Sequence, residues 1–350
     1  MSRSPHIPVV DLAPLLDPDA SPSDMTSAAT AIDEACRKIG FFAITGHGVG
    51  PDLQDRLEAA SHAFFRRPEA SKSEIAMANA GSAWRGWFPV GGELTSGVPD
   101  RKEGIYFGLE HAADHARVES ATPLHGRNQF PTEPAEFGPL VLEWLAAMRP
   151  VADAVMSGIA LGLGLPATWF AEQLTADPTV LLRIFHYPPS DRTAGDRTAG
   201  DRTVGEWGVG EHTDYGLLTL LAQDRHGGLQ VKGLDGSWID VDPEPEVLIC
   251  NLGDMLERLT AGRYRSTPHR VRNVSGESRL SFPYFFDPSW DATVPTLPST
   301  TDAAPHDDRW DGADVLAWEG TYGSYLSAKV ARVFPDLFGT ISPDSSPQSQ

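Results

Sequence analysis

A histidine and an aspartate two residues apart open the stretch EHTDYGLLTLL, which runs from Glu211 to Leu221. The leucine-rich half of this stretch is typical of a β-strand with one buried face. If the whole stretch is one strand, the side chains of His212 and Asp214 point to the same side of the sheet. An imidazole and a carboxylate on one face would supply two ligands of a metal site.

The third ligand of such a site has to come from another strand. Of the 11 histidines, His226 and His269 follow within the strand-rich part of the chain. His226 lies in the turn-like DRHGG, where we expect it to face solvent, whereas His269 in STPHRV opens a strand and is the expected ligand. Two histidines and one carboxylate form the facial triad of non-haem Fe(II) oxygenases, which leaves metal positions open. A closed zinc site would need a fourth ligand, and no cysteine is placed to supply it.

An H-x-D pattern arises often by chance, so its specificity depends on the residues that follow. Ten residues after His269, Arg279 and Ser281 stand two apart in RLSFPYFF and therefore share a face. An arginine in a half-buried strand is costly unless an anion pairs with it, and its planar fork matches a carboxylate. Beside an open Fe(II) site, the pair predicts a dicarboxylate of the shape of 2-oxoglutarate. A surface arginine in an ordinary ion pair is the alternative.

With these motifs the chain resembles the isopenicillin N synthase-like 2-oxoglutarate- and Fe(II)-dependent oxygenases. The segments IPVVDL, GFFAITGHGV, GGLQV, NLGDML and FFDP are also similar to that family, so the resemblance covers nearly the whole chain. It implies a mainly β fold with flanking helices around a distorted double-stranded β-helix (jelly roll) core. It also implies Fe(II), 2-oxoglutarate and O2, with ascorbate as an optional reductant. The reaction implied is hydroxylation of an unactivated C–H bond of a small molecule, with succinate and CO2 as coproducts.

The resemblance extends to residues around the metal. In LLRIFHYPP, Tyr187 matches a tyrosine that helps to hold 2-oxoglutarate, and Arg183 matches a position that faces the substrate. A buried cation at Arg183 would suit a substrate carboxylate, and an ion pair with an acidic residue is the alternative. Phe185 stands where relatives often have asparagine, which puts one polar contact to the cosubstrate in doubt. Phe285 would line the substrate pocket if the strand alternation survives Pro283; otherwise it is plain core.

The same resemblance implies further pocket-lining residues in the N-terminal part of the chain: Arg85, Tyr106 and Phe107.

The composition of the chain argues against nucleic-acid binding and membrane binding. The 350 residues carry a formal net charge of −20, which repels nucleic acids and anionic membranes, so we expect neither as a partner. Cys36 and Cys250 lie in apolar patterns and are expected to be buried free thiols, as in a reducing compartment. The N-terminus has no apolar signal core and no stretch is apolar for ~18 residues, so we expect a cytoplasmic protein. We also expect it to be a monomer.

The order of helical and strand patterns predicts five regions of the chain. These are an N-terminal region (1–135), a long helical segment (136–179), the catalytic core (180–290), a C-terminal helical segment (291–340) and a disordered tail (341–350). Within the core, residues 191–205 repeat the unit DRTAG three times with one change, to DRTVG. We interpret this polar repeat as an expansion in an exposed loop; a mobile lid is the alternative.

Two other functions remain open from the sequence. One is an oxidase, cyclase or desaturase like isopenicillin N synthase, which has the Arg-x-Ser pattern without using 2-oxoglutarate. The other is a non-catalytic binding module, which would need neither the metal ligands nor the anion clamp. The substrate is not predicted, although tailoring of small natural products is the expectation that the resemblance suggests.

Overall fold

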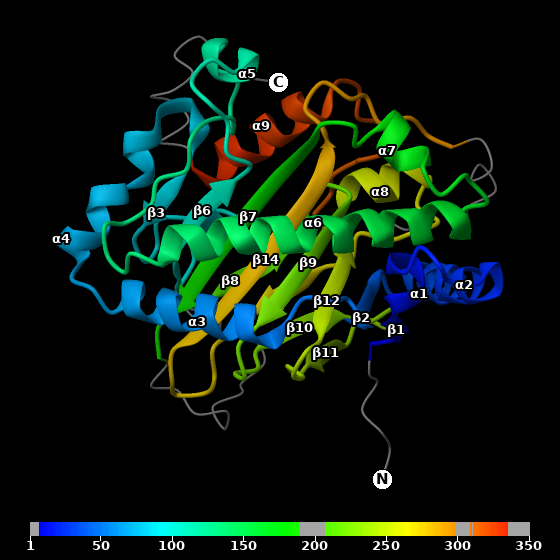
Figure 1. Ribbon diagram of the computed structural model, residues 1–350, viewed down its shortest axis with the longest axis horizontal. Coiled ribbons are helices and arrows are strands. Elements are labelled where there is room, and N and C mark those ends of the chain that lie inside the picture. Colours follow the sequence, from blue (N-terminus) through cyan, green and yellow to red (C-terminus); the bar gives the residue numbers. More distant parts are fainter. Residues whose placement is uncertain (1–6, 190–206, 298–308, 310, 335–350) are drawn as a thin grey trace.

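Two β-sheets and a layer of helices make up the protein (Figure 1). This computed structural model describes residues 7–189, 207–297, 309 and 311–334. The predicted repeat loop (191–205) and the predicted disordered tail (341–350) lie outside the described residues.

The larger sheet has eight strands in the order β1-β2-β12-β9-β14-β7-β6-β3. Its neighbours are antiparallel except for β1 and β2, which run parallel. All five residues of LICNL in β12 are buried, without alternation, because both faces of this sheet are covered. The strands are β1 (Val9–Asp11), β2 (Phe41–Thr45), β3 (Gly86–Phe88), β6 (Glu103–Gly108), β7 (Pro178–Tyr187), β9 (Leu218–Gln223), β12 (Leu248–Leu252) and β14 (Arg279–Ser289).

The smaller sheet has four strands in the order β11-β10-β13-β8, and a two-stranded hairpin, β4-β5, is formed separately. In β10 burial alternates, so that Leu229 and Val231 face the protein interior while Gln230 and Lys232 are partly exposed. The strands are β4 (Leu94–Thr95), β5 (Val98–Pro99), β8 (Val209–His212), β10 (Leu229–Lys232), β11 (Trp238–Val241) and β13 (His269–Val271). The predicted mainly β fold with flanking helices and a distorted double-stranded β-helix core is confirmed.

Helices cover the face of the larger sheet that is turned away from the smaller one. In Figure 1, α6 and α3 run side by side in front of the sheet, and α6 continues through Pro150. Trp144 of α6 packs on Phe282 of β14, with ring centroids 6.4 Å apart. The helices are α1 (Ala13–Leu16), α2 (Pro22–Lys38), α3 (Pro51–Phe65), α4 (Glu69–Lys72), η1 (Ser73–Ile75), η2 (Met77–Ala83), α5 (Ala116–Glu119), α6 (Phe137–Gly162), α7 (Trp169–Gln173), α8 (Asp254–Leu259) and α9 (Tyr322–Val333).

The long apolar helix and the two cysteines belong to the protein core. Among the described residues, α6 is the one helix that is long and apolar enough to cross a membrane, and it packs between α2, α3 and the sheet as a core helix. Cys36 and Cys250 are buried free thiols, as predicted, and burial raises the pKa of both thiols.

The stretch EHTDYGLLTLL is not one strand, so this prediction is wrong. β8 ends at His212 in the smaller sheet, and β9 begins at Leu218 in the larger sheet. The intervening ligand loop, residues 213–217, carries the chain from one sheet to the other. Asp214 therefore reaches His212 through a turn and not through strand alternation.

Gly216 allows the ligand loop to approach β14 closely. A Cβ atom at Gly216 would overlap Oδ1 of the buried Asp287. We expect Gly216→Ala to destabilise the fold by about 1–3 kcal/mol, because such overpacking displaces neighbouring atoms. Calorimetric unfolding measures this, with Gly50→Ala as the control, since a Cβ at Gly50 meets nothing within 4 Å. An unchanged melting temperature for Gly216→Ala would show that the ligand loop can move away from Asp287 without loss of stability.

Candidate active site

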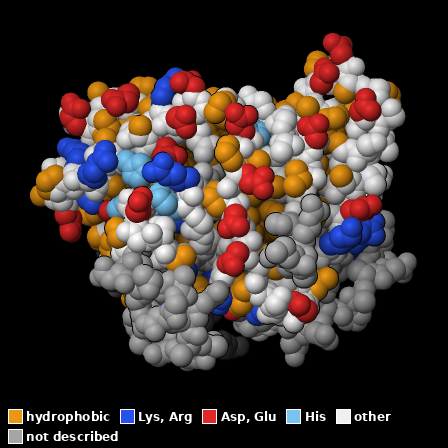
Figure 2. Space-filling view, turned by 90° about the horizontal axis from the view of Figure 1, so that it is seen from below, with side chains coloured by type: hydrophobic (Ala, Val, Ile, Leu, Met, Phe, Trp, Pro, Cys, Tyr) orange, Lys and Arg blue, Asp and Glu red, His pale blue; other side chains and the backbone are white. Residues whose placement is uncertain are grey.

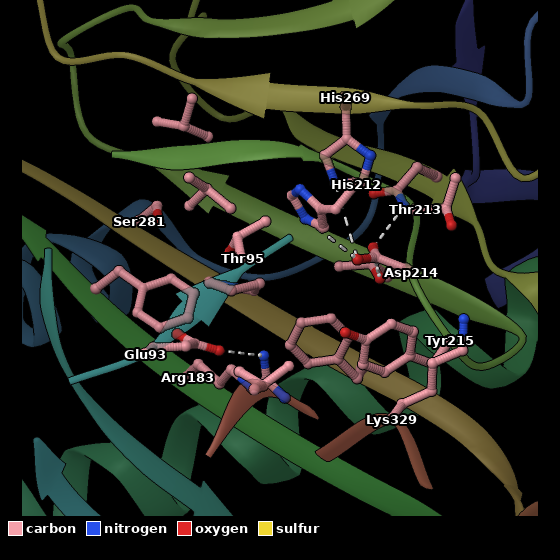
Figure 3. Close-up of a pocket in the computed structure, with 18 of the residues that line it drawn as sticks. Glu93, Thr95, Arg183, His212, Thr213, Asp214, Tyr215, His269, Ser281 and Lys329 are labelled. Carbon is pink, nitrogen blue, oxygen red and sulfur yellow. Dashed lines mark hydrogen bonds and ion pairs between the residues drawn. The ribbon is translucent and has the colours of Figure 1, made fainter. Parts of the chain in front are cut away.

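Three side chains converge at the mouth between the two sheets. Nε2 of His212 and Nε2 of His269 each lie 3.8 Å from Oδ1 of Asp214. The two histidines face each other in register on β8 and β13, and their ring centroids are 4.2 Å apart. Their ligand atoms all lie within 4.8 Å of one another, and this is the one such group among the described residues. Figure 3 shows the three side chains pointing toward a common centre.

Backbone carbonyls fix which nitrogen of each imidazole faces the centre. His212 places Nδ1 2.8 Å from the carbonyl oxygen of Gly210, and His269 places Nδ1 3.2 Å from that of Thr267. If each Nδ1–H donates there, each Nε2 keeps a lone pair for a metal. Burial, together with the neighbouring His269, lowers the pKa of His212 to about 3. The imidazole of His212 is therefore neutral at pH 7.

The larger sheet holds the carboxylate of Asp214. Oδ2 accepts hydrogen bonds from Oγ1 of Thr219 at 2.5 Å and from Nδ2 of Asn251 at 2.6 Å. Burial would raise the pKa of Asp214, but both imidazoles and these two donors outweigh it and lower the pKa. Oδ1 is left to face the histidines. Two imidazole nitrogens and one carboxylate oxygen, with no thiolate, are a donor set that fits Fe(II).

Arg279 lies on the larger sheet at one end of the same cavity. Its side chain is fully buried, Nη2 donates to Gln223 Oε1 at 2.8 Å, and Nε donates to the carbonyl oxygen of His226 at 3.2 Å. Nη1 has no hydrogen-bond partner among the described residues. Tyr187 stands directly opposite on β7, and its hydroxyl lies 3.2 Å from Oγ of Ser281. A buried guanidinium with an unused donor is a ready site for a carboxylate.

The cavity between these groups has a volume of about 420 Å³. Both sheets, the β4-β5 hairpin and α9 contribute to its walls. The triad, Arg279 and Ser281 therefore open into one space large enough for a cosubstrate and a small substrate.

Comparison with known proteins agrees with this geometry. Residues 7–133 match the family described as non-haem dioxygenase in morphine synthesis N-terminal, and residues 178–288 match the 2OG-Fe(II) oxygenase superfamily. A probable iron/ascorbate oxidoreductase of Dictyostelium discoideum is 42% identical over 348 residues, which covers 95% of this chain and 96% of that protein. The chain belongs to the 2OG-Fe(II) oxygenase superfamily.

Two further relatives span the whole length of this oxygenase. A homoarginine-6-hydroxylase of Glycine max is 35% identical over 337 residues, covering 95% of this chain and 98% of the relative. The crystal structure of a full-length Neurospora crassa protein in complex with alpha-KG and 5-formyluracil superposes with a TM-score of 0.75 at 27% identity, covering 95% of this chain and 98% of that one. The protein is thus a non-haem Fe(II)- and 2-oxoglutarate-dependent oxygenase.

The oxygenase cavity has a charged wall opposite the triad. The guanidinium of Arg183 lies between the rings of Tyr106 and Phe285, at 4.3 and 4.7 Å from their centroids. Its Nη1 is 3.6 Å from Glu93 Oε1, an ion pair that Figure 3 shows across the cavity from the triad. Nε of Arg183 is buried without a hydrogen-bond partner among the described residues. The geometry is therefore compatible with an ion pair between Arg183 and an acidic residue and also with a contact between Arg183 and a substrate carboxylate, because the ion pair with Glu93 leaves Nε unused.

Burial would raise the pKa of Glu93, but Lys102 and Arg183 outweigh it and lower the pKa. Oε1 accepts the Tyr106 hydroxyl at 2.6 Å, and Lys102 Nζ lies 2.8 Å from Oε2. The same ammonium lies 2.5 Å from Asp100 and 4.6 Å from the centroid of the Phe185 ring. A cation therefore sits beside Phe185, the position at which the family resemblance leads us to expect an asparagine.

Strand alternation on β14 continues through Pro283. The register with β7 is unbroken from Arg279 to Asp287, and Phe285 lines the cavity as the alternation predicts. Pro283 therefore introduces no bend or bulge that would exchange the two faces of the strand.

The N-terminal residues predicted to line the pocket do not line it. Arg85 is buried against Gly108 and donates through Nη2 to the carbonyl oxygen of Leu124 at 2.6 Å. Phe107 packs against α6 because it alternates with Tyr106 on β6, so its ring faces the helical layer. Tyr106 stands one layer behind the cavity and reaches it through its contacts with Glu93 and Arg183.

Contrary to our expectation, His226 does not face open solvent. It follows β9, its side chain is 15% exposed, and its ring nitrogens lie 3.1 Å from Asp224 and 3.2 Å from Glu277. These contacts place it in an ion-pair cluster and not in the triad.

Sequence reasoning missed several cavity residues that carry polar groups, among them Glu93, Lys102, Tyr215, Asp287 and Lys329. Tyr215 follows the ligand Asp214 directly in sequence, which is a usable signal. Asp287 follows from the same strand alternation as Arg279, Ser281 and Phe285, whereas Glu93, Lys102 and Lys329 come from elements that only tertiary packing brings to the cavity.

Proposed function

We propose that this oxygenase hydroxylates an unactivated C–H bond of a small molecule that carries a carboxylate or a similar anionic group. In this proposal His212, Asp214 and His269 hold Fe(II). Arg279, with Ser281 and Tyr187, holds 2-oxoglutarate. The observation that carries the cosubstrate assignment is the buried guanidinium of Arg279, whose Nη1 has no hydrogen-bond partner among the described residues.

Iron together with 2-oxoglutarate and O2 supplies an oxidant that can take hydrogen from an unactivated carbon. The chain itself orients the reactants and keeps water out. Oδ1 of Asp214 stays available because Thr219 and Asn251 occupy Oδ2. Tyr187 and Ser281 offer hydroxyl groups beside Arg279 in the cavity that also contains the triad, and in this proposal they help to orient the dicarboxylate.

The charge of the cavity wall supports an anionic substrate. Acidic side chains are spread over the face of the protein shown in Figure 2, in keeping with the net charge of −20. Five cationic side chains line the cavity against four carboxyl groups, and burial, helped by Asp214, raises the pKa of one of these, Asp287, to about 7. The cations are Lys102, Arg183, Arg279, Lys329 and Arg332, and the carboxyl groups belong to Glu93, Asp214, Asp287 and Asp311. Arg183, with Nε unused, is the proposed partner of the substrate anion, and Phe285 its neighbouring wall.

One of the two molecules named for these relatives carries such a group. Homoarginine is an amino acid and so carries a carboxylate, whereas 5-formyluracil in the Neurospora protein is a planar polar ring. A guanidinium between two aromatic rings can hold either a carboxylate or a stacked polar ring.

We expect Arg183→Met to raise the KM for the substrate by about one to two decades, because a hydrogen bond to a charged group contributes about 1.5–3 kcal/mol. The measurement is succinate formation with a panel of amino acids and other carboxylates. Arg149→Met is the matched control. The guanidinium of Arg149 lies 5.3 Å from the ring centroid of Phe286, on the helix-covered face of β14, the strand that also carries Phe285. Equal KM values for both variants would remove Arg183 from substrate binding.

An oxidase, cyclase or desaturase remains the alternative reaction on the same site. Succinate produced in proportion to hydroxylated product supports the proposal. Substrate oxidised without consumption of 2-oxoglutarate would establish the oxidase, and an unsaturated product with succinate would establish the desaturase.

A further inference from the structure

Arg309 forms a hydrogen bond with the ligand loop, next to the metal ligands. Its Nη2 donates to Oγ1 of Thr213 at 2.6 Å, and Thr213 is the residue between His212 and Asp214. Nη1 lies 2.9 Å from Oδ1 of Asp254. The Arg309 side chain is only 13% exposed, although it reaches the loop from a distant part of the sequence.

Asp254 joins the same loop to the C-terminal helix. Its side chain is fully buried at the start of α8, and its backbone N–H donates to the carbonyl oxygen of Asp214 at 2.8 Å. From α9, the hydroxyl of Tyr325 donates to Oδ2 at 2.6 Å, and Nζ of Lys329 lies 3.4 Å away. Arg309 and two residues of α9 thus converge on one buried carboxylate behind the ligand loop.

The C-terminal part of the chain also forms a wall of the cavity. Arg309 fixes the beginning of this wall through Asp311, whose Oδ1 accepts from Nε at 2.8 Å. The wall residues are Asp311, Ala313, Leu326, Lys329, Arg332 and Val333.

We propose that Arg309 is a positioning residue that ties the ligand loop to the C-terminal wall of the cavity. It acts through Thr213 and Asp254, and touches neither the substrate nor the metal. In this proposal Arg309 adds to the hydrogen bonds of Thr219 and Asn251 that position Asp214, and connects the ligand loop to one wall of the cavity. The inference rests on the proposed function, because it assumes that His212 and Asp214 bind the metal.

The contact with Thr213 predicts a measurable effect on metal affinity. Groups that orient metal ligands typically change affinity about 10–100-fold when they are removed. We expect Arg309→Met and Thr213→Val each to weaken Co(II) or Mn(II) binding to the metal-free protein by about tenfold. The double variant should bind metal no more weakly than Arg309→Met, because that substitution already removes the hydrogen bond to Thr213. Calorimetric titration of the full chain without 2-oxoglutarate measures this independently of turnover.

Thr213→Val protects the test against a folding artefact. It leaves the ion pair between Arg309 and Asp254 intact, so it is the decisive variant if Arg309→Met does not fold. Arg258→Met is the matched control. Arg258 fastens the same C-terminal part to α8, through the carbonyl oxygens of Val294, Val315 and Leu316, without touching the ligand loop. It should lower the melting temperature and leave metal affinity unchanged.

Two results would overturn the inference: wild-type metal affinity in Thr213→Val, or an equal loss of affinity in Arg258→Met. Failure of the proposed function looks different. In that case the wild-type protein itself would bind metal no better than His212→Ala.

Discussion

His269→Ala is expected to lose metal binding and turnover while the protein remains folded. The variant deletes one of the three groups whose ligand atoms lie within 4.8 Å of one another. Two remaining ligands hold a divalent metal far more weakly than three in a fixed geometry. We expect the same result for His212→Ala and Asp214→Ala. Metal content after anaerobic loading and desalting measures retention, and circular dichroism checks the fold.

His226→Ala is the control for this series. Its imidazole bonds to Asp224 and Glu277 outside the triad, so the variant should retain metal at the wild-type level. Full metal retention by His269→Ala, with loss in His226→Ala, would reverse the assignment of the third ligand.

Arg279→Ala is expected to raise the dissociation constant of 2-oxoglutarate by roughly one and a half to three and a half decades. Removing one partner of a buried, hydrogen-bonded charge pair costs about 2–5 kcal/mol, and ~1.4 kcal/mol corresponds to one decade. Iron affinity should hardly change, because Arg279 contacts Gln223, His226 and Tyr187 and no member of the triad. Anaerobic calorimetry measures 2-oxoglutarate binding on the metal-loaded protein and metal binding on the metal-free protein.

Arg279→Lys should restore only part of the affinity, because an ammonium cannot form the planar two-point contact of a guanidinium. Arg183→Met serves as the control, since it removes a different cavity cation and should leave 2-oxoglutarate binding unchanged. If Arg279→Ala binds 2-oxoglutarate with the same dissociation constant as the wild type, the cosubstrate assignment fails and the oxidase becomes the better proposal.

Sequence alone places those site residues whose position in a strand fixes the direction of the side chain. Arg279 and Ser281 are two apart in a strand with an unbroken register, so alternation alone places them on one face. His269 was selected because it opens a strand, and it does. Phe285 followed from the same alternation.

The predictions that failed needed information about partners that one strand does not contain. A leucine-rich run gave no sign that the chain leaves one sheet between His212 and Leu218. For Phe107, the strand was predicted correctly, but which face meets the helices depends on how β6 pairs with β3 and β7. Glu93 and Lys102 reach the cavity only through tertiary packing.

The ligand loop also has a consequence for the lifetime of the protein. Both histidines belong to the smaller sheet, whereas the carboxylate is held by Thr219 and Asn251 of the larger one. A bound metal therefore fastens the two sheets together, and at 100 times its dissociation constant it stabilises the fold by about 2.7 kcal/mol. An enzyme molecule that loses its iron loses this fastening as well as its activity. Spent enzyme should then be cleaved by proteases sooner than working enzyme, so that iron supply sets how long each copy survives.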